Sequence, residues 1–174
     1  MSTKARRPRV IPTARAIVLH KNRVLFLSAQ DPGRPWYFLP GGGVKHGETL
    51  KEAVAREVYE ETKVNVMAER LLYIREFIAS RHERRSQHMP EDWHVVASVF
   101  LCKVDNEVHG DADLSDIAEF QTGQDGATGV TGIKWVSLED ISEIEIMPPQ
   151  VKQALLKDFP PPPENGIEFW PEDD

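Results

Sequence analysis

Three glutamates in one short stretch have the side-chain type and spacing to bind a metal ion. Glu57, Glu60 and Glu61 stand at positions i, i+3 and i+4, so on a helix they share one face. Like charges at i and i+4 repel each other by roughly a few tenths of a kcal/mol on an isolated helix. Glu48, which precedes the predicted helix, adds a fourth carboxylate. A hard divalent cation, Mg²⁺ or Mn²⁺, would turn this repulsion into attraction.

The alternative interpretation is a solvated, charged helix face. Arg56 lies four residues from both Glu52 and Glu60, so favourable i,i+4 pairs are available, and Lys63 can reach Glu60. Charged helix faces are usually just solvated. The three glutamates taken alone therefore favour the solvated face, and the sequence around them decides between the two interpretations.

Two predicted elements position the glutamates. A glycine-rich loop over residues 41–48 follows a short aromatic strand over 36–39 and leads into a helix from about residue 50 to about 63. Thr49 is the expected N-cap, and Glu52 three residues later completes a capping box. An apolar stripe of this helix is expected to be buried, and it consists of Leu50, Val54 and Val58.

The spacing of these residues resembles the Nudix box, whose pattern is G-x5-E-x7-R-E-U-x-E-E-x-G-U, with U a bulky aliphatic residue. The matching residues are Gly42, Glu48 and then Arg56-Glu57-Val58-Tyr59-Glu60-Glu61-Thr62-Lys63-Val64. Only Lys63 departs from the pattern, which has glycine there, a residue suited to positive φ at a helix end. Residues 42–64 are thus similar to the box of MutT-like Nudix hydrolases, and Lys63 predicts a differently shaped helix end.

The resemblance implies a chemistry. It implies an Mg²⁺-dependent hydrolase, with Mn²⁺ as the alternative ion, that cleaves a pyrophosphate linkage in a nucleoside diphosphate joined to another group. The metal ligands that it implies are Glu57, Glu60 and Glu61, the backbone carbonyl of Gly42, and Glu48 as a further or supporting ligand. Arg56 would orient the carboxylates by charge-assisted hydrogen bonds, with an exposed ion pair as its alternative role.

The general base and the substrate contacts are less defined. The base is open between the box and a later acidic loop, whose candidates are Asp113, Asp116 and Glu119. Trp36 and Phe38 are candidates to stack on a nucleobase, with core packing as the alternative. The candidates to hold terminal phosphates are Arg81, Arg84 and Arg85, with solvated loop charge as the alternative.

The order of predicted elements indicates an α/β (α+β) fold. A hairpin turns at Lys21-Asn22, and the expected strands and final helix cover 10–20, 23–28, 36–39, 71–79, 93–104, 130–136 and 149–158. A mixed β-sheet covered by helices resembles the α-β-α sandwich of Nudix proteins. We expect one domain over 9–158, a flexible arm over 1–8, and an extended, proline-rich acidic tail over 159–174.

The composition of the chain argues against several classes of protein. The 174-residue chain has a net charge of -7, which argues against binding a nucleic acid polymer. No apolar run suits a membrane span and no secretory signal is visible. Cys102 is the one cysteine, which rules out an intramolecular disulfide and suits a reducing compartment, so we expect a cytoplasmic protein. The expected partner is a small nucleotide substrate, and assembly into a homodimer is left open.

Two other functions compete with the nucleotide hydrolase. One is a catalytically weak nucleotide-sensing or scaffold protein on the Nudix fold, and the other is a hydrolase of a non-nucleotide polyphosphate. Scaffold proteins of this kind usually lose box carboxylates. This chain keeps all four, Glu48, Glu57, Glu60 and Glu61, which favours the enzyme.

Overall fold

A computed structural model describes residues 9–31, 34–82, 92–110, 114 and 130–171 of the chain. The strands in these residues are β1 (Val10–His20), β2 (Arg23–Asp31), β3 (Arg34–Phe38), β4 (Gly41–Gly43), β5 (Val66–Ile78), β6 (His94–Val104), β7 (Val130–Ser137), β8 (Ile146–Met147) and β9 (Glu168–Trp170). The α-helices are α1 (Leu50–Thr62), α2 (Asn106–His109) and α3 (Pro149–Leu155). Short 3₁₀ turns are η1 (Ala79–Arg81), η3 (Leu138–Glu143) and η4 (Pro163–Asn165).

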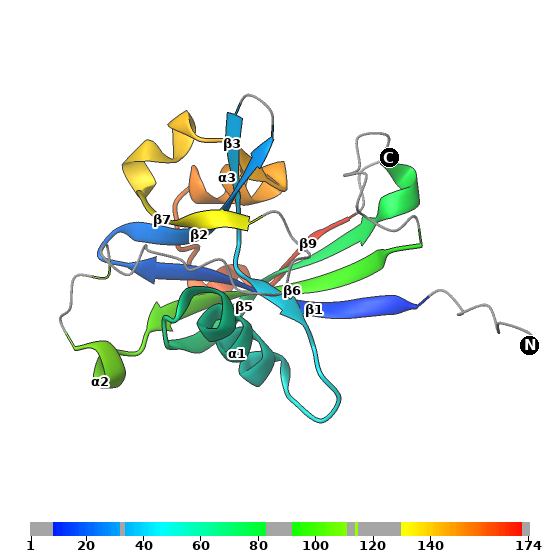
Figure 1. The fold of residues 1–174 in the computed structure, drawn as a ribbon, viewed down its shortest axis with the longest axis horizontal. Helices are drawn as coiled ribbons and strands as arrows, with labels where there is room; N and C mark the ends of the chain where they lie inside the picture. The colour runs from blue at the N-terminus through cyan, green and yellow to red at the C-terminus, as the bar shows by residue number, and fades with distance from the viewer. Residues whose placement is uncertain (1–8, 32–33, 83–91, 111–113, 115–129, 172–174) are drawn as a thin grey trace, which may run out of the picture.

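The strands form one mixed sheet in the order β8-β3-β2-β1-β6-β5-β9, with β4 added to β1 and β7 added to β2. Strands β1 and β6 run parallel, whereas β5 and β6 run antiparallel. Helix α1 lies on one side of the sheet, and α3 and η3 lie on the other (Figure 1). The predicted mixed sheet with covering helices is therefore confirmed.

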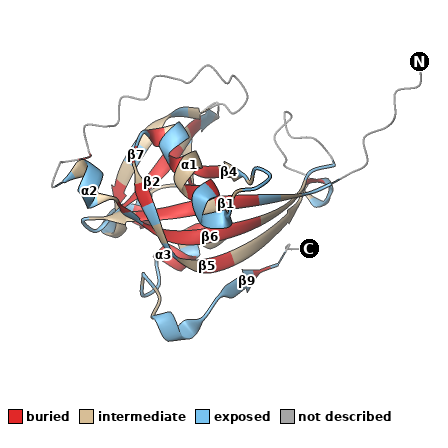
Figure 2. Ribbon diagram, turned by 90° about the horizontal axis from the view of Figure 1, so that it is seen from below, coloured by how far each residue is buried: buried red, intermediate tan, exposed pale blue. Residues whose placement is uncertain are grey.

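Strand β1 is buried on both faces. Ala14, Ala16 and Val18 pack with α1, whereas Ile17 packs with the residues of η3 and α3. Figure 2 shows the resulting run of buried residues along β1 and β6. A strand covered on both faces reads as a continuous apolar run, which is why this segment could be predicted from its sequence.

The hairpin between β1 and β2 turns where the sequence predicted. Lys21 has φ 47° and Asn22 has φ 62°. Positive φ at both central residues defines a type I′ turn, whose twist matches that of the two strands. The turn fixes the register that pairs His20 with Arg23.

The glycine run 41–43 is a strand, not the loop predicted from its composition. It pairs antiparallel with the first half of β1, with Arg15 opposite Gly41, while the end of β1 pairs with β2. Gly41 has φ +134°, and a Cβ there would lie 2.2 Å from the carbonyl oxygen of Ala14. Only glycine lets the chain pass β1 so closely, so here the residue type serves strand pairing.

Helix α1 begins with the predicted capping box. The Thr49 hydroxyl accepts from the amide of Glu52, and the Glu52 carboxylate accepts from the amide of Thr49. Val54 and Val58 are fully buried as expected. The expectation for Leu50 was wrong, since it is 38% exposed at the first turn, and Ala53 is buried in its place.

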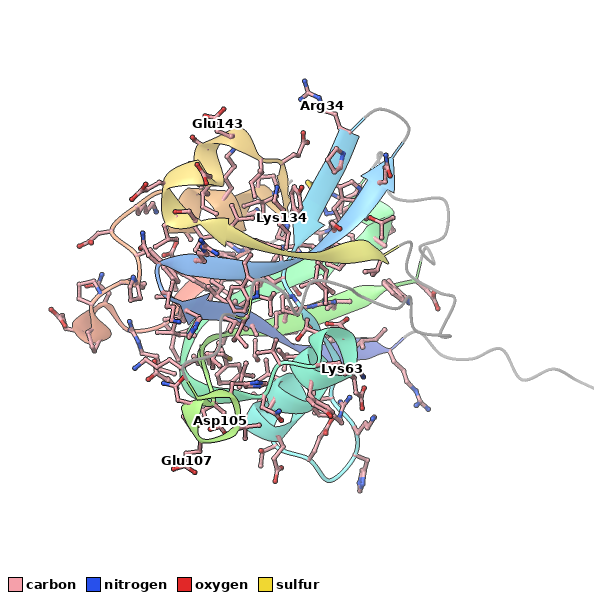
Figure 3. All side chains as sticks on the ribbon, turned by 60° about the vertical axis from the view of Figure 1, so that its left-hand side comes forward. Arg34, Lys63, Asp105, Glu107, Lys134 and Glu143 are labelled. Atoms are coloured by element: carbon pink, nitrogen blue, oxygen red, sulfur yellow. The ribbon has the colours of Figure 1, made fainter. Side chains whose placement is uncertain are left out.

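Lys63 closes α1 in the left-handed region, with φ 60° and ψ 12°. This is the conformation that the pattern's glycine would adopt without strain, so the prediction of a differently shaped helix end was wrong. The Lys63 ammonium donates to the backbone carbonyl of Glu60 at 3.2 Å rather than to its carboxylate. Figure 3 labels this side chain beside α1.

We expect Lys63→Gly to leave the free energy of unfolding unchanged or to raise it by up to about 1 kcal/mol, because it relieves left-handed strain. The lost Lys63 contact and the greater freedom of the unfolded chain oppose this gain. Urea denaturation would measure it. Lys51→Gly is the control, because Lys51 has a right-handed helical backbone and should lose about 1 kcal/mol. Equal losses in both variants would contradict a strained Lys63.

The C-terminal segment is built into the sheet, so the expected extended tail is wrong for these residues. Strand β9 pairs parallel with β5, and Trp170 is 6% exposed. Its ring stacks on Tyr73 at 4.0 Å between centroids. Arg70 donates to the carbonyls of Pro161 and Pro162. The proline-rich stretch is thus tied to β5 by a side chain as well as by strand pairing.

Other boundaries differ by a few residues. Strand β5 begins at Val66 rather than at residue 71, and α3 ends at Leu155 rather than near 158. The predicted arm over 1–8 lies outside the described residues. No helix in the described part of the chain is both long and apolar enough to span a bilayer.

Candidate functional site

Arg56 holds three of the four predicted carboxylates. Its Nε and Nη2 atoms donate to the two oxygens of Glu48 at 3.0 and 2.7 Å. Its Nη1 atom donates to Glu57 at 2.7 Å and to Glu60 at 3.0 Å. Nη2 also reaches the carbonyl of Gly43 at 3.0 Å. One guanidinium therefore links α1, the turn before it and β4.

These contacts shift the pKa values of both partners. The hydrogen bonds from Arg56 and from the Lys45 amide lower the pKa of Glu48 to about 2. The hydrogen bond to Glu48, with support from Glu57 and Glu60, raises the pKa of Arg56 above its ordinary value. Both side chains therefore stay charged at neutral pH, and their fork-shaped contact fixes the end of the turn before α1.

Glu57 lies directly against the backbone of Gly42. A Cβ on Gly42 would lie 2.5 Å from the Glu57 Oε2 atom and 2.6 Å from its Cδ atom. A Cβ there would displace the Glu57 carboxylate from its present position. The glycine at this position of the box therefore makes room for Glu57 at the strand.

Glu61 is held by the strand on its other side. Its Oε2 atom accepts from the Gly41 amide at 2.7 Å. Burial raises the pKa of Glu61 to about 7, and Glu57 and Glu60 act in the same direction, while the Gly41 amide and Arg15 oppose them. Glu61 thus resists ionisation more than an ordinary glutamate does.

The pairing of β4 corrects the prediction for the Gly42 carbonyl. The Ala16 amide donates to Pro40 at 2.9 Å, and the Val44 amide donates to Pro12 at 3.1 Å. Since an antiparallel ladder repeats every two residues, Gly42 and Ala14, which lie between these bonds, form a hydrogen-bonded pair. The Gly42 carbonyl therefore faces β1. The carbonyls of Gly41 and Gly43 face away and are contacted by Arg15 and Arg56.

Arg15 belongs to the site, although we did not select it from the sequence. It lies on β1 and donates to the carbonyls of Gly41 and Leu39. Burial lowers the pKa of Arg15 from its usual value, whereas Glu61 and Glu57 act to raise it. The signal that could have found it is a lone charge within the apolar run Ala14 to Val18, because such a charge must find partners.

Glu60 lies at the exposed rim. Its side chain is 50% exposed and contacts Lys45 at 3.4 Å as well as Arg56. Within the described residues, no three His, Cys, Asp or Glu side chains converge closely enough to hold a metal ion. The carboxylates share one region but are directed toward Arg56 and the β4 backbone.

The predicted substrate residues are only partly placed. Trp36 and Phe38 lie together on β3, half-buried, with ring centroids 5.1 Å apart. Arg81 is exposed in η1. Five candidates lie outside the described residues, namely Arg84, Arg85, Asp113, Asp116 and Glu119.

In metal-free protein, we expect stability to fall as pH rises from about 5 to 8. The folded pKa of Glu61 (about 7) exceeds that of an unfolded glutamate, so its stabilising contribution is fully present below the unfolded value and is lost as pH rises through about 7. The loss is at most about 3 kcal/mol. Glu48 contributes constantly over this range, because its folded pKa is lowered.

Melting temperature in EDTA across this pH range measures the effect. Glu61→Gln should flatten the profile, whereas Glu164→Gln on exposed η4 should leave it as in the wild type. An unchanged slope in Glu61→Gln would contradict the assignment.

Comparison with known proteins identifies the family. The family model for the NUDIX domain matches residues 10–157, so the chain belongs to the NUDIX family. A curated relative, described as the uncharacterized Nudix hydrolase YvcI of Bacillus subtilis strain 168, is 32% identical over 72 residues. That match covers 41% of this chain and 42% of the relative, so it spans about two fifths of the relative's length.

Solved structures share the fold. A MutT protein from Methanosarcina mazei Go1 is similar with a TM-score of 0.55 and 24% identity, over 88% of this chain and 95% of that one. An ADP-ribose pyrophosphatase from Streptococcus suis 89-1591 is similar with a TM-score of 0.55 and 19% identity, over 92% and 99% of the chains. At these identities the similarity establishes the architecture, and the activity must be argued from the residues.

Proposed function

We propose that this protein is a metal-dependent hydrolase that cleaves a pyrophosphate linkage in a nucleoside diphosphate joined to another group. The observation that carries the proposal is the contact between Glu57 and Gly42, in which the carboxylate lies so close to the strand that a Cβ on Gly42 would be 2.5 Å from its Oε2 atom. Membership of the NUDIX family and the names of the related proteins support it.

The chemistry of these donors suits a hard divalent cation, and in the metal-free arrangement their carboxylates are directed toward Arg56 and β4 and would have to turn to converge on one ion. Glu57 and Glu61 bring carboxylate oxygens to the glycine strand, and Glu60 and Glu48 lie within the same Arg56 network. Oxygen ligands of this kind suit Mg²⁺, with Mn²⁺ as the alternative. We propose Glu57, Glu60 and Glu61 as ligands, with the carbonyl of Gly41 in place of that of Gly42. The Gly41 oxygen has two lone pairs, so it can accept from Arg15 with one and bind the ion with the other. The bound ion would neutralise phosphate charge and lower the pKa of an attacking water.

The chain's own residues would prepare the site for this chemistry. Arg56 holds Glu48, Glu57 and Glu60 in fixed directions through charge-assisted hydrogen bonds. The Gly41 amide fixes one oxygen of Glu61 and stabilises its ionised form. The identity of the general base stays a prediction: it is either a residue of the box or an acidic residue of the later loop, namely Asp113, Asp116 or Glu119.

An unsatisfied donor supports the role of Trp36 in substrate binding. Its indole Nε1 atom is buried and has no hydrogen-bond partner in the described protein. Buried donors without partners are rare in folded proteins. A carbonyl or ring nitrogen of a nucleobase would satisfy this donor once the side chains that cover it move aside on binding, while Phe38 beside it supplies apolar contact.

We expect Trp36→Phe to raise KM for the nucleotide about 5- to 20-fold with kcat within about 3-fold, because one hydrogen bond is worth roughly 1–2 kcal/mol. The ring remains available for stacking, so the variant isolates the N–H group. Trp93→Phe is the control for losing an exposed indole. An unchanged KM in Trp36→Phe would mean that the indole N–H group does not bind the substrate and that Trp36 serves packing alone.

A substrate panel tests the proposed function. Purified protein with Mg²⁺ would be offered nucleoside diphosphate sugars, a dinucleoside polyphosphate, nucleoside triphosphates and an inorganic polyphosphate, and both phosphate-bearing products would be identified. Reactions with EDTA and with the Glu57→Gln variant are the negative controls. Cleavage of the nucleotide derivatives supports the proposal. Cleavage of the inorganic polyphosphate alone, or nucleotide binding without turnover, would overturn it in favour of the two competing functions.

We also propose the cytoplasm as the compartment. Cys102 is free and buried, and burial raises the pKa of its thiol to about 12, so it is unreactive. A single small-molecule nucleotide is the proposed partner. Assembly into a homodimer stays a prediction.

A further inference from the structure

Arg15 is a charged side chain in an apolar position. It lies on the central strand β1 between Ala14 and Ala16, which are both fully buried. Burying a guanidinium without partners is costly, so its contacts show what it is used for. Those contacts are backbone carbonyls, of Leu39 at 3.4 Å and of Gly41 at a shorter distance, and no carboxylate of the described residues lies within ion-pair distance.

Gly41 is consequently held at both ends. Its amide donates to Glu61, and its carbonyl accepts from Arg15. Its backbone adopts φ +134° and cannot carry a side chain, because a Cβ would meet the carbonyl of Ala14 and the Cα of Arg15 itself. Without a side chain to fix it, the orientation of this residue depends on these two contacts and on its pairing with β1.

The carbonyl that Arg15 contacts belongs to the peptide between Gly41 and Gly42. Because a peptide unit is planar, holding its oxygen also fixes the position of the Gly42 Cα atom. Gly42 is the residue against which Glu57 packs. Arg15 is thus connected to Glu61 through the Gly41 amide and to Glu57 through Gly42, without touching either.

Arg56 makes the corresponding contact two residues later. Its Nη2 atom donates to the carbonyl of Gly43. The carbonyls of Gly41 and Gly43 both face away from β1, so each outward carbonyl of β4 is contacted by one arginine. Only Arg56 belongs to the box, and Arg15 lies outside it.

We propose that Arg15 is a positioning residue that orients the Gly41–Gly42 peptide and thereby sets Glu61 and Glu57 for metal binding. Its positive charge also lies where Glu61 and Glu57 stabilise it against burial. The catalytic part of this inference rests on the proposed function, whereas the structural part concerns the metal-free protein. Residues that orient metal ligands typically change metal affinity or activity by about 10- to 100-fold when replaced.

The competing role is direct contact with substrate phosphate. Arginine suits phosphate, and the contacts to Leu39 and Gly41 use only the Nη1 atom. The two roles differ in their kinetics. A substrate contact changes KM for the nucleotide, whereas a positioning residue changes Mg²⁺ affinity and kcat.

The test compares Arg15→Met, which keeps the chain length without charge or donors, with Arg15→Lys, which keeps the charge but loses the fork. Arg23→Met, an exposed arginine at the start of β2, controls for loss of one positive charge. Three quantities are measured: the Gly41 amide resonance by NMR in metal-free protein, the Kd for Mg²⁺ by calorimetry, and kcat and KM for the best substrate.

We expect Arg15→Met to move the Gly41 resonance in the same direction as Glu61→Gln does. We also expect it to weaken Mg²⁺ binding about 10-fold or more and to lower kcat with nucleotide KM within about 3-fold. Arg15→Lys should lie between Arg15→Met and the wild type. A raised KM with unchanged Mg²⁺ affinity would overturn the proposal in favour of substrate contact, and an unchanged Gly41 resonance would also overturn it.

The experiments distinguish failure of the proposed hydrolase function from failure of the proposed positioning role of Arg15. If wild-type protein hydrolyses no substrate, the proposed function fails, while the Gly41 resonance and the Mg²⁺ affinity still decide the role of Arg15. If Arg15→Met does not fold, Arg15→Lys supplies the same measurements. Loss of the fold in both variants would assign Arg15 to global stability and overturn the positioning role.

Discussion

Glu57→Gln is expected to lower kcat at least ~100-fold, because it removes the carboxylate charge that lies against Gly42 of the glycine strand. The amide keeps the shape of the side chain, so the loss measures charge rather than packing. Steady-state kinetics with saturating Mg²⁺, together with calorimetric Mg²⁺ affinity, would quantify it. Melting temperature in EDTA would verify that the variant is folded.

Two other glutamates serve as comparisons for Glu57. Glu60 is half exposed at the rim of the cluster, so Glu60→Gln should cost less than Glu57→Gln, on the order of 10-fold. Glu164 lies on exposed η4, and Glu164→Gln should match the wild type. Turnover of Glu57→Gln within about 3-fold of the wild type would remove the metal-ligand assignment.

Trp170→Ala is expected to reduce the free energy of unfolding by about 3–5 kcal/mol, since it deletes a buried aromatic ring. In a chain of 174 residues this corresponds to a fall in Tm of about 10 °C. The ring that loses its stacking partner is Tyr73 on β5, so the damage should extend into the sheet core.

The neighbouring Phe169 provides a matched control for Trp170. Phe169 is 56% exposed on the opposite face of β9, and Phe169→Ala should cost less than about 1 kcal/mol. Chemical denaturation of the two variants would compare a buried and an exposed aromatic residue on the same strand. Equal, small losses in both would mean that β9 adds little to the stability of the sheet.

The parts of the fold and site that could be predicted depend on interactions between residues close together in the sequence. The capping box at Thr49 and Glu52 and the hairpin turn at Lys21 and Asn22 each depend on residues only a few positions apart. The family pattern also lies within one continuous stretch, residues 42–64, which is why the box was recognisable. In each case the interacting residues are close in sequence, so their spacing alone specifies the contact.

The features that could not be predicted depend on contacts between distant residues. The stacking of Trp170 on Tyr73 joins segments almost a hundred residues apart. No pattern in the sequence of the proline-rich segment predicts this contact. The glycine run resembles a loop by composition, because only its pairing with β1 makes it a strand. The preference of a residue for a strand depends on its structural context more than its preference for a helix does.

The register between β4 and β1 also predicts where related chains can change in length. One residue inserted within 41–43 would reverse the alternation, turning toward β1 the two carbonyls that the arginines contact. An insertion or deletion between β4 and α1 would displace Glu48 from Arg56. We therefore expect indels in homologous chains to be absent between Pro40 and Arg56 and to collect in connections outside that interval.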